Sequence, residues 1–334
     1  YPGYKAVTND EIRQKFEKGW GASLPANVGL KIPEMFDAAY EGKVKAMYIL
    51  GENPVLTDPN SNHIRAALEK LDFLVVQELF LSETAEYADV ILPAASFAEC
   101  DGTFTNTERR VQRVRKAIEP IPGKANWQII CEMATRVGFP MDYEHPGQIW
   151  NEMASLTPSM AGINYQRLEN SSLQWPCPSE DHPGTPYLHK GKFTRGLGLF
   201  QPSDHIPPGE MPDEEYPFLL STGRILYHYN VTTPYSPGIA SVWDKEMAEI
   251  HPDDAAKLGL VTGKQVKIIS RRGEVVSAVR VTDRVQPGMI WMSFHHSATP
   301  TNALTSHVLD PVTGTGEYKV CAVKIEKIPE VANA

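Results

Sequence analysis

Apolar and polar positions alternate along the first 140 residues in a way that predicts strands followed by helices. Short apolar runs cover Val44 to Leu50, Phe73 to Val76 and Asp89 to Pro93, and each has the length of a buried strand. Apolar residues recur at helical spacing from Ser61 to Leu71 and from Trp127 to Val137. This alternation predicts a parallel sheet covered by helices, with ligand groups at the carboxyl ends of its strands.

The pattern becomes rich in short β-type runs after residue 214. One predicted helix interrupts them from His251 to Gly259, with Pro252 in its first turn and Gly259 as its stop. Because so many short strands would leave exposed edges in an open sheet, a closed barrel is the natural arrangement. The predicted strands are Phe218 to Ser221, Gln265 to Ser270, Val275 to Val281, Met289 to Ser293 and Val320 to Ile325.

Between these regions lies a segment that is rich in Pro, Gly and His and shows little periodicity. We expect an ordered connector or lobe, because Trp175, Tyr187, Phe193 and Phe200 require packing partners. The predicted organisation is therefore an α/β domain over residues 1–140, a connector over 141–213 and a β-barrel domain over 214–334.

Composition excludes several classes of protein. The 334 residues are 42% hydrophobic and 22% charged, which is typical of a globular chain, and no apolar stretch approaches membrane-spanning length. A net charge of −9 without any Lys/Arg run argues against a nucleic-acid partner. The first residues, Tyr1-Pro-Gly-Tyr4, are neither a methionine start nor a signal peptide, so we interpret the chain as a piece whose upstream part is missing.

The cysteines predict no metal centre. Cys100, Cys131, Cys177 and Cys321 are scattered and form no Cys-x-x-Cys pair, which disfavours a zinc site or an iron–sulfur cluster held by this chain. Free thiols indicate a reducing compartment, and we expect a cytoplasmic location. The tandem histidines His295 and His296 could suggest a metal site, but neighbouring residues on a strand point to opposite faces and cannot readily bind one metal together. We expect them to serve packing or a cofactor edge instead.

Polar side chains that could bind a nucleotide follow the predicted strands. Asn53 lies in Gly51-Glu-Asn-Pro54 after the first strand, Thr57 follows shortly, and Gln77 ends the second strand. Amide side chains such as these and Asn126 offer paired donors and acceptors that suit the edge of a purine base. Turn formation and sheet-end placement are the alternative explanations for them.

A second group of polar residues follows the first strand of the β-rich region. Thr222 and Gly223 end the apolar run, and the glycine lets backbone N–H groups approach an anion closely. Arg224 adds a planar guanidinium and His228 a ring nitrogen four positions on. The alternative is an ordinary strand, a turn and a solvated arginine.

Seven motifs, in order, resemble those of the molybdenum or tungsten bis-molybdopterin guanine dinucleotide oxidoreductases, and within them the catalytic subunit of formate dehydrogenase. The resemblance runs from Tyr1 to about Ile328. It depends on Gly51-Glu-Asn-Pro54, Val75-Val-Gln-Glu78, Ala88-Asp-Val-Ile-Leu-Pro93, the segment from Glu99 to Gln112, Gln174-Trp-Pro-Cys177, Ser221-Thr-Gly-Arg224, and Thr301-Asn-Ala-Leu304 with Glu317-Tyr-Lys319.

The resemblance implies a Rossmann-like parallel α/β domain that grips a guanosine, followed by a double-psi-type β-barrel that caps the pterins. By match to the motifs, one set of residues would hold the nucleotide: Asn53, Thr57, Gln77 and Asn126. A second set would approach the pterins and their phosphates: Thr222, Gly223, Arg224, His228, Asn302, Tyr318 and Lys319.

The family's reaction is the reversible oxidation of formate to CO2 at a molybdenum or tungsten centre, with electrons leaving through a [4Fe-4S] cluster. The resemblance places the metal ligand, the substrate arginine and the cluster cysteines upstream of Tyr1, so this chain would hold no catalytic residue and no metal ligand. The implied partners are the upstream part of the same subunit and an electron-transfer iron–sulfur subunit. The alternatives are a nitrate reductase, the large iron–sulfur subunit of respiratory complex I, and a non-catalytic pterin-dinucleotide-binding module.

Overall fold

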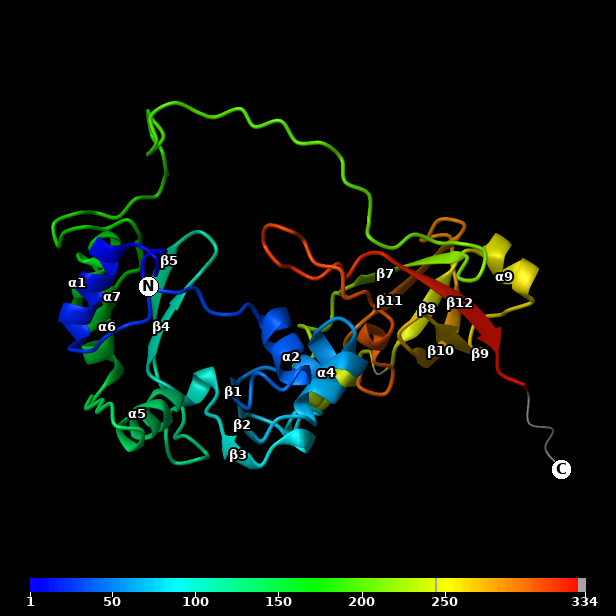
Figure 1. Ribbon diagram of the computed structural model, residues 1–334, viewed down its shortest axis with the longest axis horizontal. Helices are drawn as coiled ribbons and strands as arrows, with labels where there is room; N and C mark the ends of the chain where they lie inside the picture. The colour runs from blue at the N-terminus through cyan, green and yellow to red at the C-terminus, as the bar shows by residue number, and fades with distance from the viewer. Residues whose placement is uncertain (244, 330–334) are drawn as a thin grey trace. The chain divides into compact units, whose positions relative to one another are not determined.

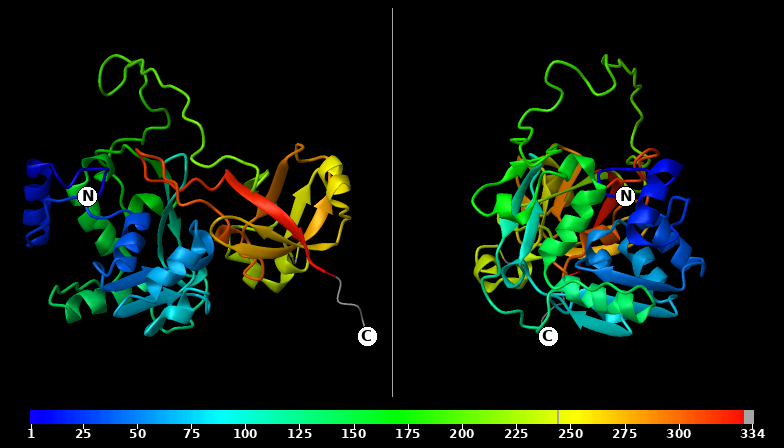
Figure 2. Two further views of the ribbon diagram at one scale, coloured as in Figure 1. Left: turned by 45° about the vertical axis from the view of Figure 1, so that its right-hand side comes forward. Right: turned by 90° about the vertical axis from the view of Figure 1, so that its left-hand side faces the viewer.

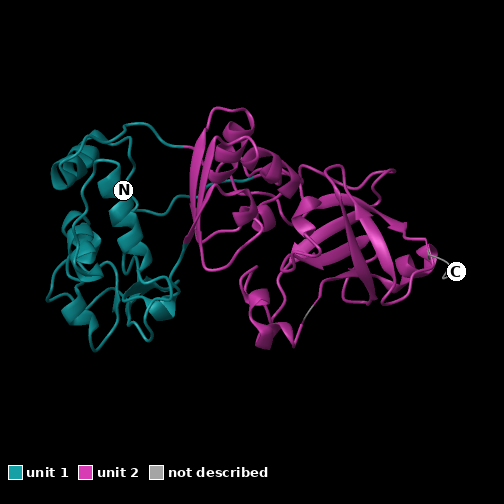
Figure 3. Cartoon of the chain, turned by 90° about the horizontal axis from the view of Figure 1, so that it is seen from below, with its two compact units in different colours: residues 1–29, 93–203 teal, residues 30–92, 204–334 magenta. Residues whose placement is uncertain are grey.

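The computed structural model describes residues 1–243 and 245–329. The chain divides into two compact units (Figure 3). The first unit comprises Tyr1–Gly29 and Pro93–Ser203, and the second comprises Leu30–Leu92 and Asp204–Ala334. Within the described residues, no helix has both the length and the apolar character needed to cross a membrane.

The second unit contains the predicted parallel sheet. Its strands are β1 (Ala46–Leu50), β2 (Phe73–Glu78) and β3 (Val90–Pro93), in that order across the sheet (Figure 1). Strands β1 and β2 pair in parallel, so the prediction from the apolar runs is confirmed for these two. The accompanying helices are α2 (Ile32–Tyr40), α3 (Pro54–Thr57), α4 (Ser61–Leu68) and the short 3-10 helix η1 (Ala85–Tyr87).

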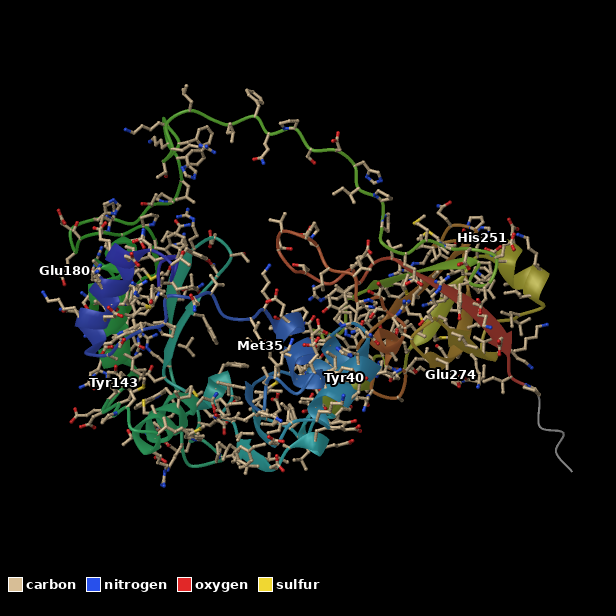
Figure 4. All side chains as sticks on the ribbon, in the orientation of Figure 1. Met35, Tyr40, Tyr143, Glu180, His251 and Glu274 are labelled. Carbon is tan, nitrogen blue, oxygen red and sulfur yellow. The ribbon has the colours of Figure 1, made fainter. Side chains whose placement is uncertain are left out.

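One apolar core holds these helices to the sheet. Helix α4 buries Ile64, Ala67 and Leu68, which share one face at helical spacing, against Leu74 and Val76 of the central strand. Four successive residues of β2, Leu74 to Gln77, are buried, so both faces of this central strand are covered there. Tyr40 ends α2 near the ring of the α4 residue His63, with ring centroids 5.0 Å apart (Figure 4).

The β-rich region forms a closed six-stranded barrel, as predicted. Around the barrel the strand order is β10-β8-β11-β7-β12-β9, and parallel and antiparallel pairs are mixed. Figure 2 shows this part of the chain, coloured yellow to red, from two further sides. The strands are β7 (Phe218–Gly223), β8 (Met247–Ile250), β9 (Gln265–Ile269), β10 (Glu274–Val281), β11 (Met289–Ser293) and β12 (Cys321–Lys327). Helix α9 (Pro252–Leu258) ends at Gly259 in the left-handed conformation, which confirms the predicted helix and its stop. Shorter elements between the strands are η4 (Thr233–Tyr235), α8 (Pro237–Ala240) and η5 (Thr301–Ala303).

Strand β8 is the barrel strand that the sequence pattern did not predict. It has four residues, and one of them, Glu249, is a carboxylate only 4% exposed. Arg284 and Arg280 compensate that charge at 3.1 and 3.7 Å. A charged residue within so short a run hides the apolar signal, because only the tertiary structure supplies the partners that allow it to be buried.

The first unit combines helices with a small antiparallel sheet. Its strands β4 (Gly102–Thr105), β5 (Arg110–Val114) and β6 (Leu173–Gln174) lie in that order. Its core includes Val111 from β5, Trp150 from α6 and Leu173 from β6. The helices are α1 (Asp10–Trp20), α5 (Asn126–Arg136), α6 (Pro146–Leu156) and α7 (Tyr165–Leu168), with the 3-10 helices η2 (Phe97–Glu99) and η3 (Pro158–Met160).

The Pro- and Gly-rich segment contains regular structure only in its first part. Residues 175–217, all of them described, contain no helix or strand. Trp175 packs against the core of the first unit, as expected. The same expectation is wrong for Tyr187, Phe193 and Phe200, which are all more than half exposed.

One buried amide joins the barrel to the sheet inside the second unit. Asn302, in η5, donates from Nδ2 to the carbonyl oxygens of Leu56 and Thr57 at 2.9 and 3.0 Å. Its Oδ1 accepts from the hydroxyl of Thr305 at 3.3 Å. The side chain is 1% exposed, so both carbonyls depend on it for their hydrogen bonds.

We predict that Asn302→Ala lowers the free energy of unfolding by about 1–3 kcal/mol, because buried carbonyl oxygens lose their donors. The exposed Asn62 is a matched control, since its Nδ2 also donates to a barrel carbonyl, that of Arg272 at 3.0 Å. Asn62→Ala should cost about 0.5 kcal/mol or less, because water replaces the lost bond. Chemical denaturation measures both variants, and equal losses would contradict the bridging role of Asn302.

Candidate functional site

Residues far apart in the sequence meet at the end of β7. The hydroxyl of Thr222 donates to the carbonyl oxygen of Tyr318 at 2.7 Å, and Lys319 Nζ donates to the carbonyl oxygen of Thr222 at 2.7 Å. The antiparallel pairing of β12 with β7 causes this meeting, because it places Cys321 opposite Leu220. The structure therefore brings together two groups that the sequence analysis assigned to one ligand.

Gly223 has a packing role at this position. A β-carbon at Gly223 would lie 2.6 Å from Nε1 of the Trp291 side chain and 2.9 Å from its Cζ2. Trp291 lies in the neighbouring strand β11, where Ser293 pairs with Gly223. Only glycine leaves room for the indole ring, so the turn into Arg224 keeps its position against the barrel.

The site carries two cations in an acidic chain. Arg224 and Lys319 are both exposed, and neither forms an ion pair with a carboxylate in residues 1–243 and 245–329. Burial of its ammonium, followed by the nearby Arg224 charge, lowers the pKa of Lys319. Repulsion between two cations without a carboxylate counterion favours the binding of an anion.

His228 is fixed by the protein around it. Its ring is 4% exposed, with Nε2 2.7 Å from the carbonyl oxygen of Trp243 and Nδ1 3.0 Å from the hydroxyl of Thr233. The rings of His295 and His296 lie 5.4 and 5.2 Å from it. The tandem histidines were expected to lie on a strand, and this is wrong, because β11 ends at Ser293.

The sequence pattern gave Asn230 and Glu83 no role, and it predicted only a packing or cofactor-edge role for His295. Asn230 accepts from Nε of Arg224 at 2.6 Å, and His295 contacts both the backbone and the rings of this region. Glu83 accepts from Nδ2 of Asn53 at 2.6 Å. Nothing in the local pattern marks these residues, because their partners are distant in the sequence or in turns.

The predicted nucleotide residues already have partners within the protein. The Asn53 amide oxygen accepts from the backbone and the hydroxyl of Thr84 at 3.2 and 2.7 Å. Gln77 is fully buried and accepts from the hydroxyl of Tyr48. The Thr57 hydroxyl donates to the carbonyl oxygen of Asn53 at 3.1 Å. These three side chains shape the strand ends of the second unit.

Asn126 belongs to the first unit, where it begins α5. Its Oδ1 accepts from the backbone N–H of Ala95 at 2.8 Å and its Nδ2 donates to the Ala95 carbonyl at 2.9 Å. This two-bond pairing mimics a strand pair and fixes the start of the helix. The side chain therefore has a defined structural partner in its own unit.

Asp58 lies beside Tyr318 and lines a pocket of about 300 Å3 together with Phe36, Asn60, His63 and His307. Burial, with a smaller contribution from Glu52, raises the pKa of Asp58 to about 6, although a bond from the Thr57 hydroxyl opposes the shift. Burial, followed by the Asp58 charge, also raises the pKa of Tyr318. Both groups are therefore neutral in mildly acidic solution.

No group of three or more His, Cys, Asp or Glu side chains placed to hold a metal ion occurs in the described part of the chain. The four cysteines form no disulfide, and three of them are buried. Burial raises the pKa of Cys131, and it raises that of Cys321 to about 12. These two thiols are poor ligands in the folded chain, because a metal binds the thiolate.

Two family models match this chain. Residues 8–136 match the model described as molybdopterin oxidoreductase, and residues 218–322 match the model described as molydopterin dinucleotide binding domain. The second range spans most of the barrel, and the first includes the parallel sheet. The chain is also similar in fold to acetylene hydratase from Pelobacter acetylenicus, with a TM-score of 0.70 and 18% identity over 98% of this chain and 51% of that one.

Curated relatives are similar over nearly the whole chain. The F420-dependent formate dehydrogenase 2 subunit alpha of Methanococcus maripaludis is 46% identical over 98% of this chain and 49% of its own length. Its counterpart in Methanocaldococcus jannaschii is 45% identical with the same coverage. Formate dehydrogenase H of Escherichia coli is 40% identical over 99% of this chain and 48% of its own length. The chain spans about half the length of these relatives.

We predict that Asp58→Asn makes the free energy of unfolding less dependent on pH. The folded protein binds the Asp58 proton more tightly than the unfolded chain, whose pKa is close to the ordinary 3.8. Protonated Asp58 therefore contributes fully to the free energy of unfolding below about pH 4, and this contribution is lost as the pH rises through the folded pKa of about 6. The free energy of unfolding should change by up to about 2–3 kcal/mol. Denaturant titrations between pH 4 and 7 measure it.

The exposed Asp283 supplies the control for this titration. Asp283→Asn should leave the pH dependence of the wild type in place. If Asp58→Asn also retains that pH dependence, the raised pKa of Asp58 is refuted.

Proposed function

Since the chain belongs to the molybdopterin oxidoreductases, we propose that it is the cofactor-binding portion of a formate dehydrogenase alpha subunit. The similarity to three formate dehydrogenase subunits at 40–46% identity supports this choice of substrate. The observation that carries the binding role is the pair of cations at the end of β7, which lack carboxylate partners among the described residues.

The chemistry of these residues fits the bis-molybdopterin guanine dinucleotide cofactor with molybdenum or tungsten. The cofactor's phosphates are anionic, and a guanidinium binds a phosphate through two parallel hydrogen bonds. Arg224 would bind a phosphate of the cofactor, and Lys319 would add a second positive charge beside it. Gly223, which has no side chain, leaves room for the Trp291 ring next to this turn. When bound, the metal centre would supply the oxidation of formate to CO2, and this chain would bind and orient the cofactor.

The remaining residue assignments belong to the same proposal. Thr222 and Tyr318 would shape the pterin end, since they join β7 to the segment before β12. Asn302 would contribute by joining η5 to α3. His228 would hold the segment that follows Arg224. Asn53, Thr57, Gln77 and Asn126 would position the backbone that faces the nucleotide, because their side chains already bond within the protein.

We further propose that the chain acts together with the remainder of an alpha subunit and with a separate electron-transfer subunit. The remainder of the alpha subunit would supply the metal ligand and a [4Fe-4S] cluster, and an iron–sulfur subunit would accept the electrons. Four cysteines without a disulfide support a reducing, cytoplasmic setting.

The division into an α/β domain over residues 1–140, a connector over 141–213 and a β-barrel domain over 214–334 stays part of this proposal.

We predict that Arg224→Ala lowers the pterin and metal content of the holoprotein by about tenfold or more, because the phosphate loses a charge-assisted bond. Arg224→Lys should have an intermediate content, since it keeps the charge but has no planar fork. Pterin fluorescence after oxidation and metal analysis per mole of protein measure both. Arg195, an exposed arginine of the first unit, supplies the control Arg195→Ala, which should load fully. Full loading of Arg224→Ala would refute the binding role.

The 334-residue chain by itself should not reduce a dye with formate, because its described residues include no cluster of metal ligands and at least two of its thiols are protonated. A dye-reduction assay on the isolated polypeptide, loaded with cofactor where it binds, tests this. Formate-dependent turnover by that polypeptide alone would contradict the proposed division of roles.

A further inference from the structure

The ring of His295 makes two hydrogen bonds that together determine its protonation. The backbone N–H of Ile225 points at Nε2 at 3.3 Å, and Nδ1 lies 2.6 Å from the carbonyl oxygen of Asn230. A backbone N–H can only donate and a carbonyl oxygen can only accept. Nε2 must therefore be the acceptor, and Nδ1 must carry the hydrogen.

These two bonds connect the ends of one loop, residues 224–230. Ile225 lies at its start and Asn230 at its end, and Asn230 has a positive φ of 48° that few residues other than glycine and asparagine adopt. The side chain of the same Asn230 accepts from Nε of Arg224 at 2.6 Å. Asn230 therefore connects the two residues, with its backbone carbonyl bonded to His295 and its side-chain oxygen bonded to Arg224.

The surroundings of His295 favour the neutral ring. It is 1% exposed, and burial lowers its pKa, with further lowering by His228, His296 and Arg224, whereas the bond to Asn230 opposes the shift. The nearby carboxyl of Glu246 is occupied by the Ser293 backbone and hydroxyl at 2.7 and 2.5 Å, and burial raises its pKa. A protonated ring would lose the Ile225 bond and add a charge beside Arg224.

We infer that His295 is a positioning residue for Arg224, because its ring, held in the Nδ1–H tautomer, closes the 224–230 loop and fixes the backbone of Asn230, whose side chain accepts from Arg224. This inference rests on the proposed function only for the identity of the ligand. His295 itself need not touch the cofactor. It sets the direction of the guanidinium before the anion arrives, so less side-chain freedom is lost on binding.

Nearby His228 offers an internal comparison. Its Nε2 faces the carbonyl oxygen of Trp243, so Nε2 must carry a hydrogen. Its Nδ1 faces the hydroxyl of Thr233, which can donate to it. Two buried imidazoles with centroids 5.4 Å apart should therefore carry a hydrogen on opposite nitrogens.

Solid-state NMR of the wild-type holoprotein labelled with 15N-histidine tests the tautomer directly. The signal that disappears in His295→Gln should show a protonated Nδ1 and an unprotonated Nε2 at pH 7. An Nε2–H tautomer or an imidazolium at this position would overturn the inference. The tautomer itself is read from the wild type, and if His295→Gln does not fold, the loss of the same signal in His295→Asn assigns it.

A double-mutant cycle on pterin content tests the positioning role. His295→Gln removes the donor at Nδ1 and should lower pterin retention by about tenfold, whereas His295→Asn, which can place an amide N–H near the same point, should retain more. In the Arg224→Ala background, His295→Gln should cause little further loss, since both act through one contact. The exposed His205→Gln supplies the control.

The outcomes separate the two proposals. Additive losses in the cycle would show that His295 acts on the protein generally and would overturn its positioning role. Full pterin content in Arg224→Ala would overturn the binding role of Arg224, and the positioning role with it, independently of the observed tautomer. Thermal unfolding of each variant shows whether a loss of pterin reflects the loop or the whole fold.

Discussion

Strand β7 lies between β11 and β12 in the barrel, and the register of these two pairings determines the whole site. Pairing with β12 places Cys321 opposite Leu220, which brings Lys319 to the end of β7. Pairing with β11 places Ser293 opposite Gly223, which brings His295 beside the loop that follows. Because strand faces alternate, a shift of one residue in either pairing would turn these side chains away from one another.

The local charge of the site opposes the charge of the whole chain. A chain with a net charge of −9 repels anions at long range, yet the end of β7 presents two cations without carboxylate partners among the described residues. Water and salt screen the distant acidic side chains, whereas groups in direct contact with a ligand are screened little. The positions of Arg224 and Lys319 therefore matter more for binding than the net charge does.

The sequence predicted the elements that depend on local pattern. The apolar runs of β1 and β2, the barrel strands with alternating burial and the helix that ends at Gly259 were all correctly identified. Strand β8 was missed because Glu249 can be buried only with arginines from other segments. The expected packing of Phe200 was wrong because an aromatic residue indicates a need for burial but does not supply a partner.

The candidate site was predictable only in part for a similar reason. The motifs grouped Thr222, Arg224 and Lys319, and the structure brings these three residues together. Asn230 was not assigned to the site, and His295 was expected only to serve packing or a cofactor edge, because no sequence pattern records the bonds that these two residues form. The motifs thus indicate which residues we propose to face a ligand, and the packing shows which residues hold them in place.

The antiparallel pairing of β12 with β7 also constrains when the site can exist. Thr222 and Lys319 are separated by 97 positions. The contact between them depends on the pairing of β7, the first barrel strand along the chain, with β12, the last. Contacts between such distant positions form late, because the loop between them must be closed first. A ribosome-bound chain that has exposed Arg224 but not yet β12 cannot hold an anion at this place. At the proposed site, cofactor insertion would therefore follow the synthesis of the complete barrel.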